Sequence, residues 1–137
     1  MGQLLDRAAI FAAKDIKTER VPVPEWGGDV LVRGLTGTQR DDYEASLVVT
    51  KGSNREMNLK NARAKLIIRS VVTEDGKPMF TEGDLEALGG KSASALERIF
   101  TVARRLSGLS EEDVDELVKP SGEIPKEASV LGGSTSS

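Results

Sequence analysis

Three consecutive residues, Gly90-Lys91-Ser92, are of the types that bind phosphate in nucleotide-binding proteins. A phosphate-binding loop also has a glycine five residues before the glycine of this triplet, and it follows a buried strand. Here Leu85 occupies that position, and a capped helix is expected where the strand should be. We therefore interpret the triplet as a joint between two helices. Gly89 and Gly90 would bend the chain there, and Ser92 would cap the next helix.

A second stretch with chemical potential surrounds Asp75-Gly76, which together with Glu82 matches three positions of a calcium-binding loop. The first and third positions of that loop need carboxylates, but they are Val71 and Thr73 in this chain. Two of the expected calcium ligands are therefore missing. The stretch predicts a tight turn at Asp75-Gly76 between short extended segments.

Catalysis is disfavoured by the absence of histidine and cysteine, which removes the usual general base, the thiol nucleophile and the commonest zinc ligands. Neighbouring carboxylates occur at Asp41-Asp42 and Glu111-Glu112-Asp113. Both groups lie in the first turns of predicted helices, where negative charge complements the helix dipole. We predict that the protein is not an enzyme and uses no cofactor or metal.

Charge is unevenly distributed along a chain of net charge −3. Residues 51–69 contain six basic residues and one acid, whereas residues 109–127 contain seven acids and two lysines. Nucleic-acid binding is not expected, because the net charge is negative and residues 44–79 contain no aromatic side chain for base stacking. The basic stretch is either a solvated helix face or a surface complementary to acids of a neighbouring copy. Its candidate partner-binding residues are Arg55, Lys60, Arg63 and Arg69.

Trp26 is a fifth candidate for binding a partner protein. It is the single tryptophan of the chain and precedes Gly27-Gly28 in a predicted turn. Either it folds back onto the core or it is an exposed anchor, since tryptophan is enriched among binding hot spots.

The first residues include an apolar segment, LLDRAAIFAA, which Asp6 and Arg7 interrupt. A membrane-spanning helix needs about 20 predominantly apolar residues, and a signal peptide needs a basic segment before its apolar core. The segment fits neither pattern and predicts a short amphipathic helix at residues 4–12. We expect no membrane contact and a location in the cytoplasm where the protein is made.

Residues 19–34 predict a β-hairpin, because short β-branched segments flank the turn residues Glu25-Trp26-Gly27-Gly28. Pro22 and Pro24 cannot donate ladder hydrogen bonds, so the first strand belongs at a sheet edge. Helical patterns follow, and Gly89-Gly90 is expected to end one helix in the left-handed conformation. Five helices are predicted after the hairpin. The first is capped by Thr38–Asp41 and ended by Gly52, and the second is opened by Ser53–Glu56 and continues to about Val71. The third is capped by Thr81–Asp84, the fourth is opened by Ser92, and the fifth is capped by Ser110–Asp113.

The predicted fold class is α+β and mainly α, with an N-terminal β-hairpin followed by a bundle of about four to five short helices. Residues 1–118 are expected to form a single globular domain, with the hairpin at 19–34 and the helical part at 36–118. Residues 119–137 are rich in Pro, Gly and Ser and lack apolar periodicity. They predict a flexible, disordered C-terminal tail.

Read in order, these segments resemble the tail assembly chaperones of long-tailed phages, particularly those of actinobacterial hosts. The resemblance covers about residues 3–118. The motifs that carry it most strongly are Val23-Pro24-Glu25-Trp26-Gly27, Arg33-Gly34-Leu35-Thr36-Gly37, Asp75-Gly76 followed by Phe80-Thr81, and Leu88-Gly89-Gly90-Lys91-Ser92. These motifs are turns, caps and core positions, so the resemblance transfers no catalytic or binding residue.

The resemblance implies a non-enzymatic protein that binds the tape-measure protein, keeps its hydrophobic helices soluble and helps recruit tail-tube subunits. Such proteins act in the host cytoplasm and are usually absent from the mature virion. Many have a longer form, made by a ribosomal frameshift, whose extra domain binds the tail-tube protein; this chain would match the short form. We also expect a homo-oligomer around the tape measure. The alternative is a structural virion component, such as a tail connector or a tube-associated protein.

Overall fold

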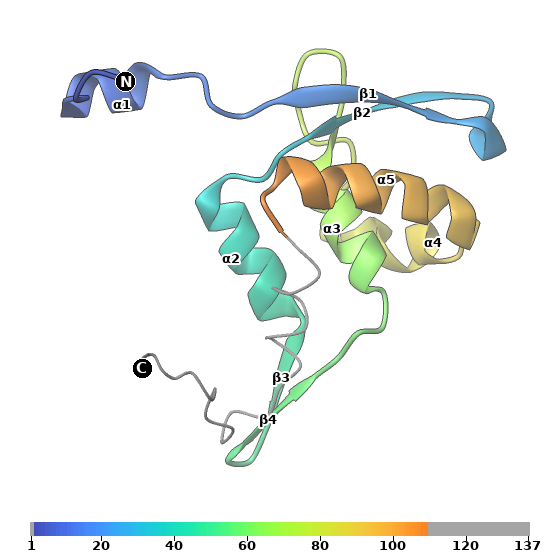
Figure 1. The fold of residues 1–137 in the computed structure, drawn as a ribbon. Coiled ribbons are helices and arrows are strands. Elements are labelled where there is room, and N and C mark those ends of the chain that lie inside the picture. The colour runs from blue at the N-terminus through green and yellow to red at the C-terminus, as the bar shows by residue number, and fades with distance from the viewer. Residues whose placement is uncertain (1, 110–137) are drawn as a thin grey trace.

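The computed structural model describes residues 2–109, and Figure 1 shows how their elements are arranged. A small sheet lies on one side of a group of helices, which confirms the predicted α+β class. The last predicted helix at Ser110–Asp113, the acids of the 109–127 stretch and the tail at 119–137 lie outside the described residues. The domain boundary at residue 118 therefore remains a prediction.

The predicted β-hairpin is confirmed. β1 (Thr18–Val23) pairs antiparallel with β2 (Gly28–Arg33), and the turn between them is a single 3₁₀ turn, η1 (Pro24–Trp26). Gly27 follows this turn with a φ of 75°, a value that glycine adopts without strain. A short strand, β5 (Val71–Val72), pairs with the other side of β2. β1 is therefore an edge strand, as its prolines predict.

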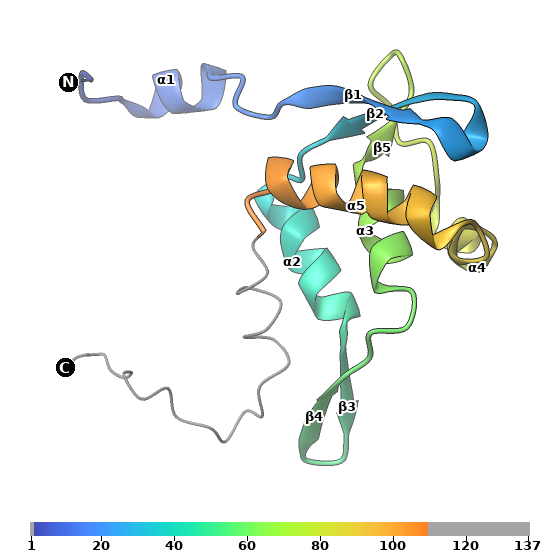
Figure 2. The ribbon, with the colours of Figure 1, turned by 45° about the vertical axis from the view of Figure 1, so that its right-hand side comes forward.

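Helices cover one face of this sheet (Figures 1 and 2). The longest is α5 (Ala93–Leu106), which packs beneath β1 and β2 and against α3 (Ala62–Ser70). α2 (Gly37–Ser46) and α4 (Leu85–Gly89) pack against α3 from other sides. No helix among residues 2–109 is long and apolar enough to cross a membrane.

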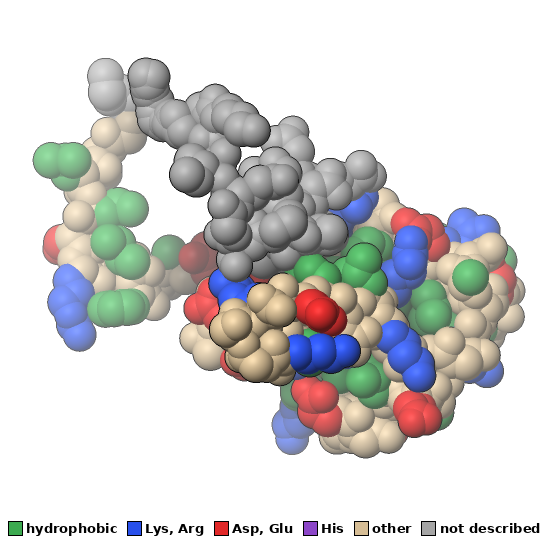
Figure 3. Space-filling model, turned by 90° about the horizontal axis from the view of Figure 1, so that it is seen from below, with side chains coloured by type: hydrophobic (Ala, Val, Ile, Leu, Met, Phe, Trp, Pro, Cys, Tyr) green, Lys and Arg blue, Asp and Glu red, His purple; other side chains and the backbone are tan. Residues whose placement is uncertain are grey.

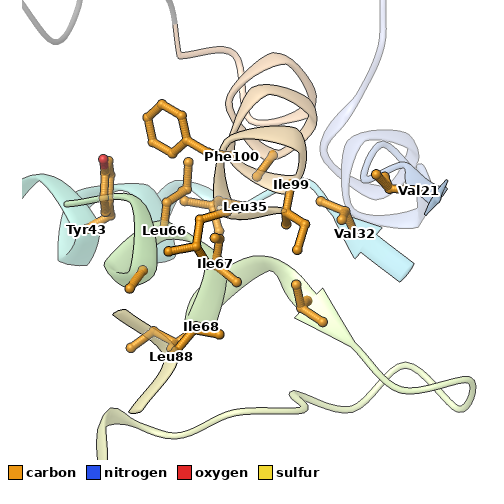
Figure 4. Packing of buried hydrophobic residues seen from close by; sticks show 14 of the residues in the cluster. Val21, Val32, Leu35, Tyr43, Leu66, Ile67, Ile68, Leu88, Ile99 and Phe100 are labelled. Atoms are coloured by element: carbon orange, nitrogen blue, oxygen red, sulfur yellow. The ribbon is translucent and has the colours of Figure 1, made fainter. Parts of the chain in front are cut away.

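One hydrophobic core holds the sheet and the helices together. α5 contributes apolar residues at helical spacing, as its sequence predicts, so that one face of the helix is buried. Figure 4 shows side chains from the hairpin, α2, α3 and α5 converging on one interior. Large, deeply buried members of the core are Val23, Val32, Tyr43, Leu47, Leu66, Ile67 and Ile99.

The residue that caps the start of α2 is Thr36, two residues earlier than Thr38 of the predicted cap at Thr38–Asp41. The side chain of Thr36 accepts a hydrogen bond from the backbone amide of Gln39 at 3.1 Å, and the Gln39 side chain accepts one from the amide of Thr36 at 2.9 Å. The capping box is therefore formed by Thr36 and Gln39 instead of the predicted Thr38 and Asp41.

The prediction for residues 48–57 is wrong. β3 (Val48–Lys51) and β4 (Asn54–Met57) form a second hairpin there, with Gly52 and Ser53 as its two-residue turn. Gly52 has a φ of 63°, so it serves a hairpin turn rather than ending a helix. Ser53 and Glu56 do not form a capping box, and the next helix, α3, begins only at Ala62. This hairpin projects away from the helices (Figure 2).

The later turns agree more closely with the sequence. Gly76 has a φ of 82° and donates its amide to the carbonyl of Thr73 at 2.9 Å, which confirms the predicted turn. Thr81 and Asp84 form a capping box at the start of the 3₁₀ helix η2 (Glu82–Asp84), which leads into α4. Gly90 ends α4 as predicted but with a φ of −83°, so the expected left-handed conformation is wrong.

An extended arm, residues 2–17, precedes β1 and points away from the rest of the molecule (Figures 1 and 2). It contains α1 (Arg7–Ala12), which confirms a short helix within residues 4–12. The side chain of Asp6 caps this helix by accepting a hydrogen bond from the amide of Ala9 at 2.8 Å. No residue of α1 is buried.

Candidate partner-binding grooves

A broad open groove of about 1020 Å³ lies between β1 and the first turns of α3 and α5, and we call it the α3–α5 groove. Its lining combines apolar, polar and charged side chains. The apolar lining residues are Val21, Pro22, Leu59, Ala62, Ala64, Ala93 and Leu96. The charged lining residues are Arg63, Lys91 and Arg98, which are basic, and Glu97, which is acidic.

The two arginines of this groove are held by carboxylates. Arg98 donates from Nε to both carboxylate oxygens of Glu25, at 3.0 and 3.1 Å. Arg63 donates to Glu97, and its guanidinium lies 5.5 Å from the centroid of the Phe100 ring. In contrast, Lys91 pairs with no acid among residues 2–109. The two arginine side chains are therefore held in place within the fold, whereas the Lys91 ammonium group remains available to an acidic partner.

Glu25 is held in its charged form beside this groove. A hydrogen bond from its own backbone, followed by the hydrogen bond from Arg98, lowers the pKa of Glu25 below its ordinary value. The carboxylate therefore stays ionised at neutral pH and keeps the Arg98 side chain in place.

A smaller groove of about 510 Å³ lies at the turn end of the β1–β2 hairpin, and we call it the Trp26 groove. η1, α4 and the segment after β5 form it. Its apolar lining consists of Trp26, Met79, Phe80, Ala87 and Leu88, and its charged lining residues are Asp84 and Lys91. Lys91 thus lines both grooves.

The Gly90-Lys91-Ser92 triplet forms the helix joint that its spacing predicts. The amide of Gly90 donates to carbonyls of α4 at 3.2 Å, and the amide of Lys91 donates to the carbonyl of Leu88 at 3.0 Å. The Ser92 hydroxyl accepts from the amide of Ala95 at 3.3 Å and caps α5. Two amides that a phosphate would need are thus already used. Residues 2–109 also contain no cluster of three acidic side chains suited to a metal.

The five candidate partner-binding residues do not share one surface. Trp26 is half-buried, packs against the core and also lines the Trp26 groove, while its binding of a partner stays a prediction. Arg63 lines the α3–α5 groove, and Lys60 is exposed beside Leu59 of the same groove. These positions leave Trp26, Lys60 and Arg63 as candidates for contacting a partner.

The remaining two candidates lie elsewhere. Arg55 is exposed on β4, in the projecting hairpin. The Arg69 side chain is only 14% exposed and donates to the carbonyl of Lys65 at 2.7 Å and to Glu82 at 3.0 Å. Of the two alternatives for the basic stretch, a single helix face does not hold, because α3 begins after Arg55 and Lys60 and because Arg69 is engaged within the fold.

Several exposed apolar residues were not identified from the sequence. Leu59 and Met79 are half exposed, and each lines one groove. The arm exposes a larger set, and Figure 3 shows hydrophobic side chains standing out along it. Periodicity does identify the apolar side of this short helix, but it cannot show that nothing in the fold covers that side.

Comparison with known proteins finds a matching family model and a solved structure of similar fold. The sequence model of a family described as "Phage tail assembly chaperone" matches residues 5–120. A search of curated proteins finds no match. The fold is similar to a solved structure described as "Structure of bacteriophage HK97 tail assembly chaperone", with a TM-score of 0.50 and 22% sequence identity. The similarity covers 66% of this chain and 85% of that chain.

Proposed function

This chain belongs to the family of phage tail assembly chaperones, and from that premise we propose that it binds the tape-measure protein and keeps its hydrophobic helices soluble during assembly. The proposal includes a location in the host cytoplasm and absence from the mature virion. It also includes recruitment of tail-tube subunits through a longer frameshifted form. The family is one of chaperones, which are generally not enzymes.

The observation that supports this proposal most directly is the α3–α5 groove. An amphipathic helix binds by placing its apolar side in a hydrophobic groove while its polar sides remain near water. Leu59 is half exposed and Pro22 is exposed, so the groove presents apolar surface that such a helix would cover. Lys91 pairs with no acid among the described residues, so it favours a tape-measure helix with an acidic residue beside its apolar side.

Co-expression of the chain with its tape-measure protein tests the proposal. We expect the tape measure to become soluble and to co-purify. L59D, which places a charge in the groove, should reduce co-purification at least tenfold, whereas L59M should retain it. Because Leu59 lies outside the helices and strands, circular dichroism of both variants should match the wild type.

Two results would contradict the proposal at different levels. If the tape-measure protein stays insoluble when it is co-expressed with the wild-type chain, the proposal that the chain is its chaperone is contradicted. Co-purification that L59D leaves unchanged would show that the client binds outside the α3–α5 groove. Mass spectrometry of purified phage particles addresses the location, since abundance of the chain there would favour a structural virion component.

A further inference from the structure

Leu109, the last described residue, lies near the end of α5 and the start of α2. After α5, Gly108 adopts a φ of 72°, and the amide of Leu109 donates back to the carbonyl of Arg104 at 2.9 Å. This hydrogen-bonded turn ends the helix and redirects the chain. Leu109 is 5% exposed within the core, and the hydroxyl of Ser107 accepts a hydrogen bond from the amide of Leu35, just before α2. The residues that follow Leu109 therefore begin beside both helices.

Two arginines lie on the helices next to this point. Arg40 in α2 donates from Nε to Glu44 at 3.2 Å, and the guanidinium of Arg104 in α5 lies 5.5 Å from the centroid of the Phe100 ring. Burial raises the pKa of Tyr43 in α2, and Arg104 is one of the cations that oppose this rise, so its charge lies near α2 as well. A guanidinium has five N–H donors, so an arginine that already binds one carboxylate can bind a second. We call Arg40, Arg104 and Phe100 the α2–α5 surface.

The unpaired acids of α2 lie away from this surface. Arg40, Tyr43 and Leu47 are spaced so that they share one side of the helix, and Tyr43 and Leu47 are buried in the core. Asp41 and Asp42 are exposed on the other side. The side of α2 that carries Arg40 can therefore accept further negative charge.

Residues 110–118, SEEDVDELV, follow the described residues and have the chemistry that this surface needs. They contain five acids and no basic residue. Val114 and Leu117 are three positions apart, so they share one side of the helix predicted there. The first three acids are two to four residues past Leu109, within about 14 Å of it even in an extended chain. The family model matches residues 5–120, so the match includes this segment.

We propose that residues 110–118 bind the α2–α5 surface of their own chain. Their acids would pair with Arg40 and Arg104, and Val114 and Leu117 would cover the Phe100 ring. The covalent link keeps these acids at a high effective concentration beside the two arginines. The chain's own segment is therefore favoured over acidic residues of any other molecule.

The α3–α5 groove stays open in this arrangement. That groove is lined by β1, the residues leading into α3, the start of α3, the α4–α5 joint and residues 93–101 of α5. The segment would instead lie at the other end of α5 and along α2. A client helix and the segment can then bind at the same time, and residues after 118 leave from the α2 side. This inference does not depend on tape-measure binding.

Hydrogen–deuterium exchange of the full-length chain tests the contact. A nine-residue helix is marginal in water without a packing surface, so protection of its amides reports binding. We expect the wild-type amides of residues 114–118 to exchange at least tenfold more slowly than those of an unstructured peptide of the same sequence. R104Q and V114D should each remove this protection, because the first loses an ion pair and the second places a charge against Phe100.

R105Q is the matched control for R104Q. Arg105 is in the same turn of α5 but donates to Glu19 of β1 at 2.9 Å, so R105Q should keep the wild-type protection of the segment. The amide of Ile67, a residue of α3 that is 0% exposed, should stay protected in every variant and so show that the domain remains folded.

L59D reports whether the segment lies in the other surface. It should keep the wild-type protection, and a loss in L59D but not in R104Q would place the segment in the α3–α5 groove and overturn the proposal. Wild-type amides that exchange like the unstructured peptide, or an R104Q variant that matches the wild type, would also overturn it. Because the tape-measure protein is absent from these measurements, their outcome is separable from a failure of client binding.

Discussion

At the scale of single residues, Tyr43 shows how the core controls an ionisable group. Its side chain is 1% exposed among apolar neighbours. Burial raises the pKa of Tyr43, and the positive charges of Arg69, Arg63 and Arg104 oppose this rise only in part. The phenol therefore stays neutral over a wider pH range in the folded state than in the unfolded state.

This shift predicts how stability depends on alkaline pH. The folded pKa lies above the unfolded one, so the linked stability is complete below the unfolded value of about 10 and is lost as pH rises through the folded value. We expect the melting temperature of the wild type to fall more steeply above about pH 10 than that of Y43F. Thermal melts of both proteins across this range measure the difference. Parallel curves would show that Tyr43 does not cause the alkaline loss.

Some residue roles could be read from the sequence, and others depend on distant contacts. The spacing around Gly90 already argues against a phosphate site, because Leu85 stands where a glycine is needed. Gly89 was expected to supply a left-handed turn, but a Cβ at Gly89 would lie 2.5 Å from the Oδ1 of Asn61. This close approach comes from a side chain 28 positions earlier in the chain, so no local pattern predicts it.

At the scale of elements, Ser92 fixes where α5 begins. Its hydroxyl accepts the amide of Ala95, one of the donors that a helix start leaves unsatisfied. We expect S92A to lower the free energy of unfolding by about 1 kcal/mol. S94A is the control, because Ser94 is exposed inside the helix, where alanine is a good helix former; it should not destabilise the protein. Urea denaturation measures both variants, and equal stabilities for S92A and the wild type would contradict the cap.

The elements that the sequence predicts well are those whose apolar pattern matches their burial. α5 buries Ala95, Leu96 and Ile99 at helical spacing, and the β1–β2 hairpin has a clear turn between β-branched segments. In contrast, the β3–β4 hairpin places no residue fully in the core. Its sequence therefore carries little apolar alternation, and Ser53 with Glu56 matches a capping box as well as it matches a turn.

At the scale of the whole molecule, the sheet and the helices come very close at Gly34. A Cβ on this residue would lie 2.5 Å from the backbone carbonyl oxygen of Leu106, at the end of α5. The amide of Leu35 donates to the hydroxyl of Ser107 at 3.0 Å, so the end of β2 is tied to the end of α5. Only glycine allows this approach, because the obstructing atom is backbone and cannot rotate away.

We therefore expect G34A to lower the free energy of unfolding by about 1–3 kcal/mol, the usual cost of overpacking. G37A is a matched control, because a Cβ at Gly37 meets no atom within 4 Å and alanine favours the first turn of α2. Denaturant unfolding of both variants measures the difference. Equal stability of G34A and the wild type would mean that α5 can shift away from the sheet at no cost.

The candidate grooves could be predicted only in part, because distant segments build them. Trp26 was identified by its residue type, but its groove also needs Phe80 and Leu88 from later elements. Arg63 was identified by its charge, but its groove also needs Pro22 and Leu96. Sequence patterns describe one element at a time, whereas a groove exists only after several elements have packed.

Lys91 is a wall residue of both grooves. Occupants of the two grooves would therefore meet the same ammonium group. Any preference that one occupant imposes on the position of Lys91 is then transmitted to the other, and thermodynamic linkage makes the effect equal in both directions.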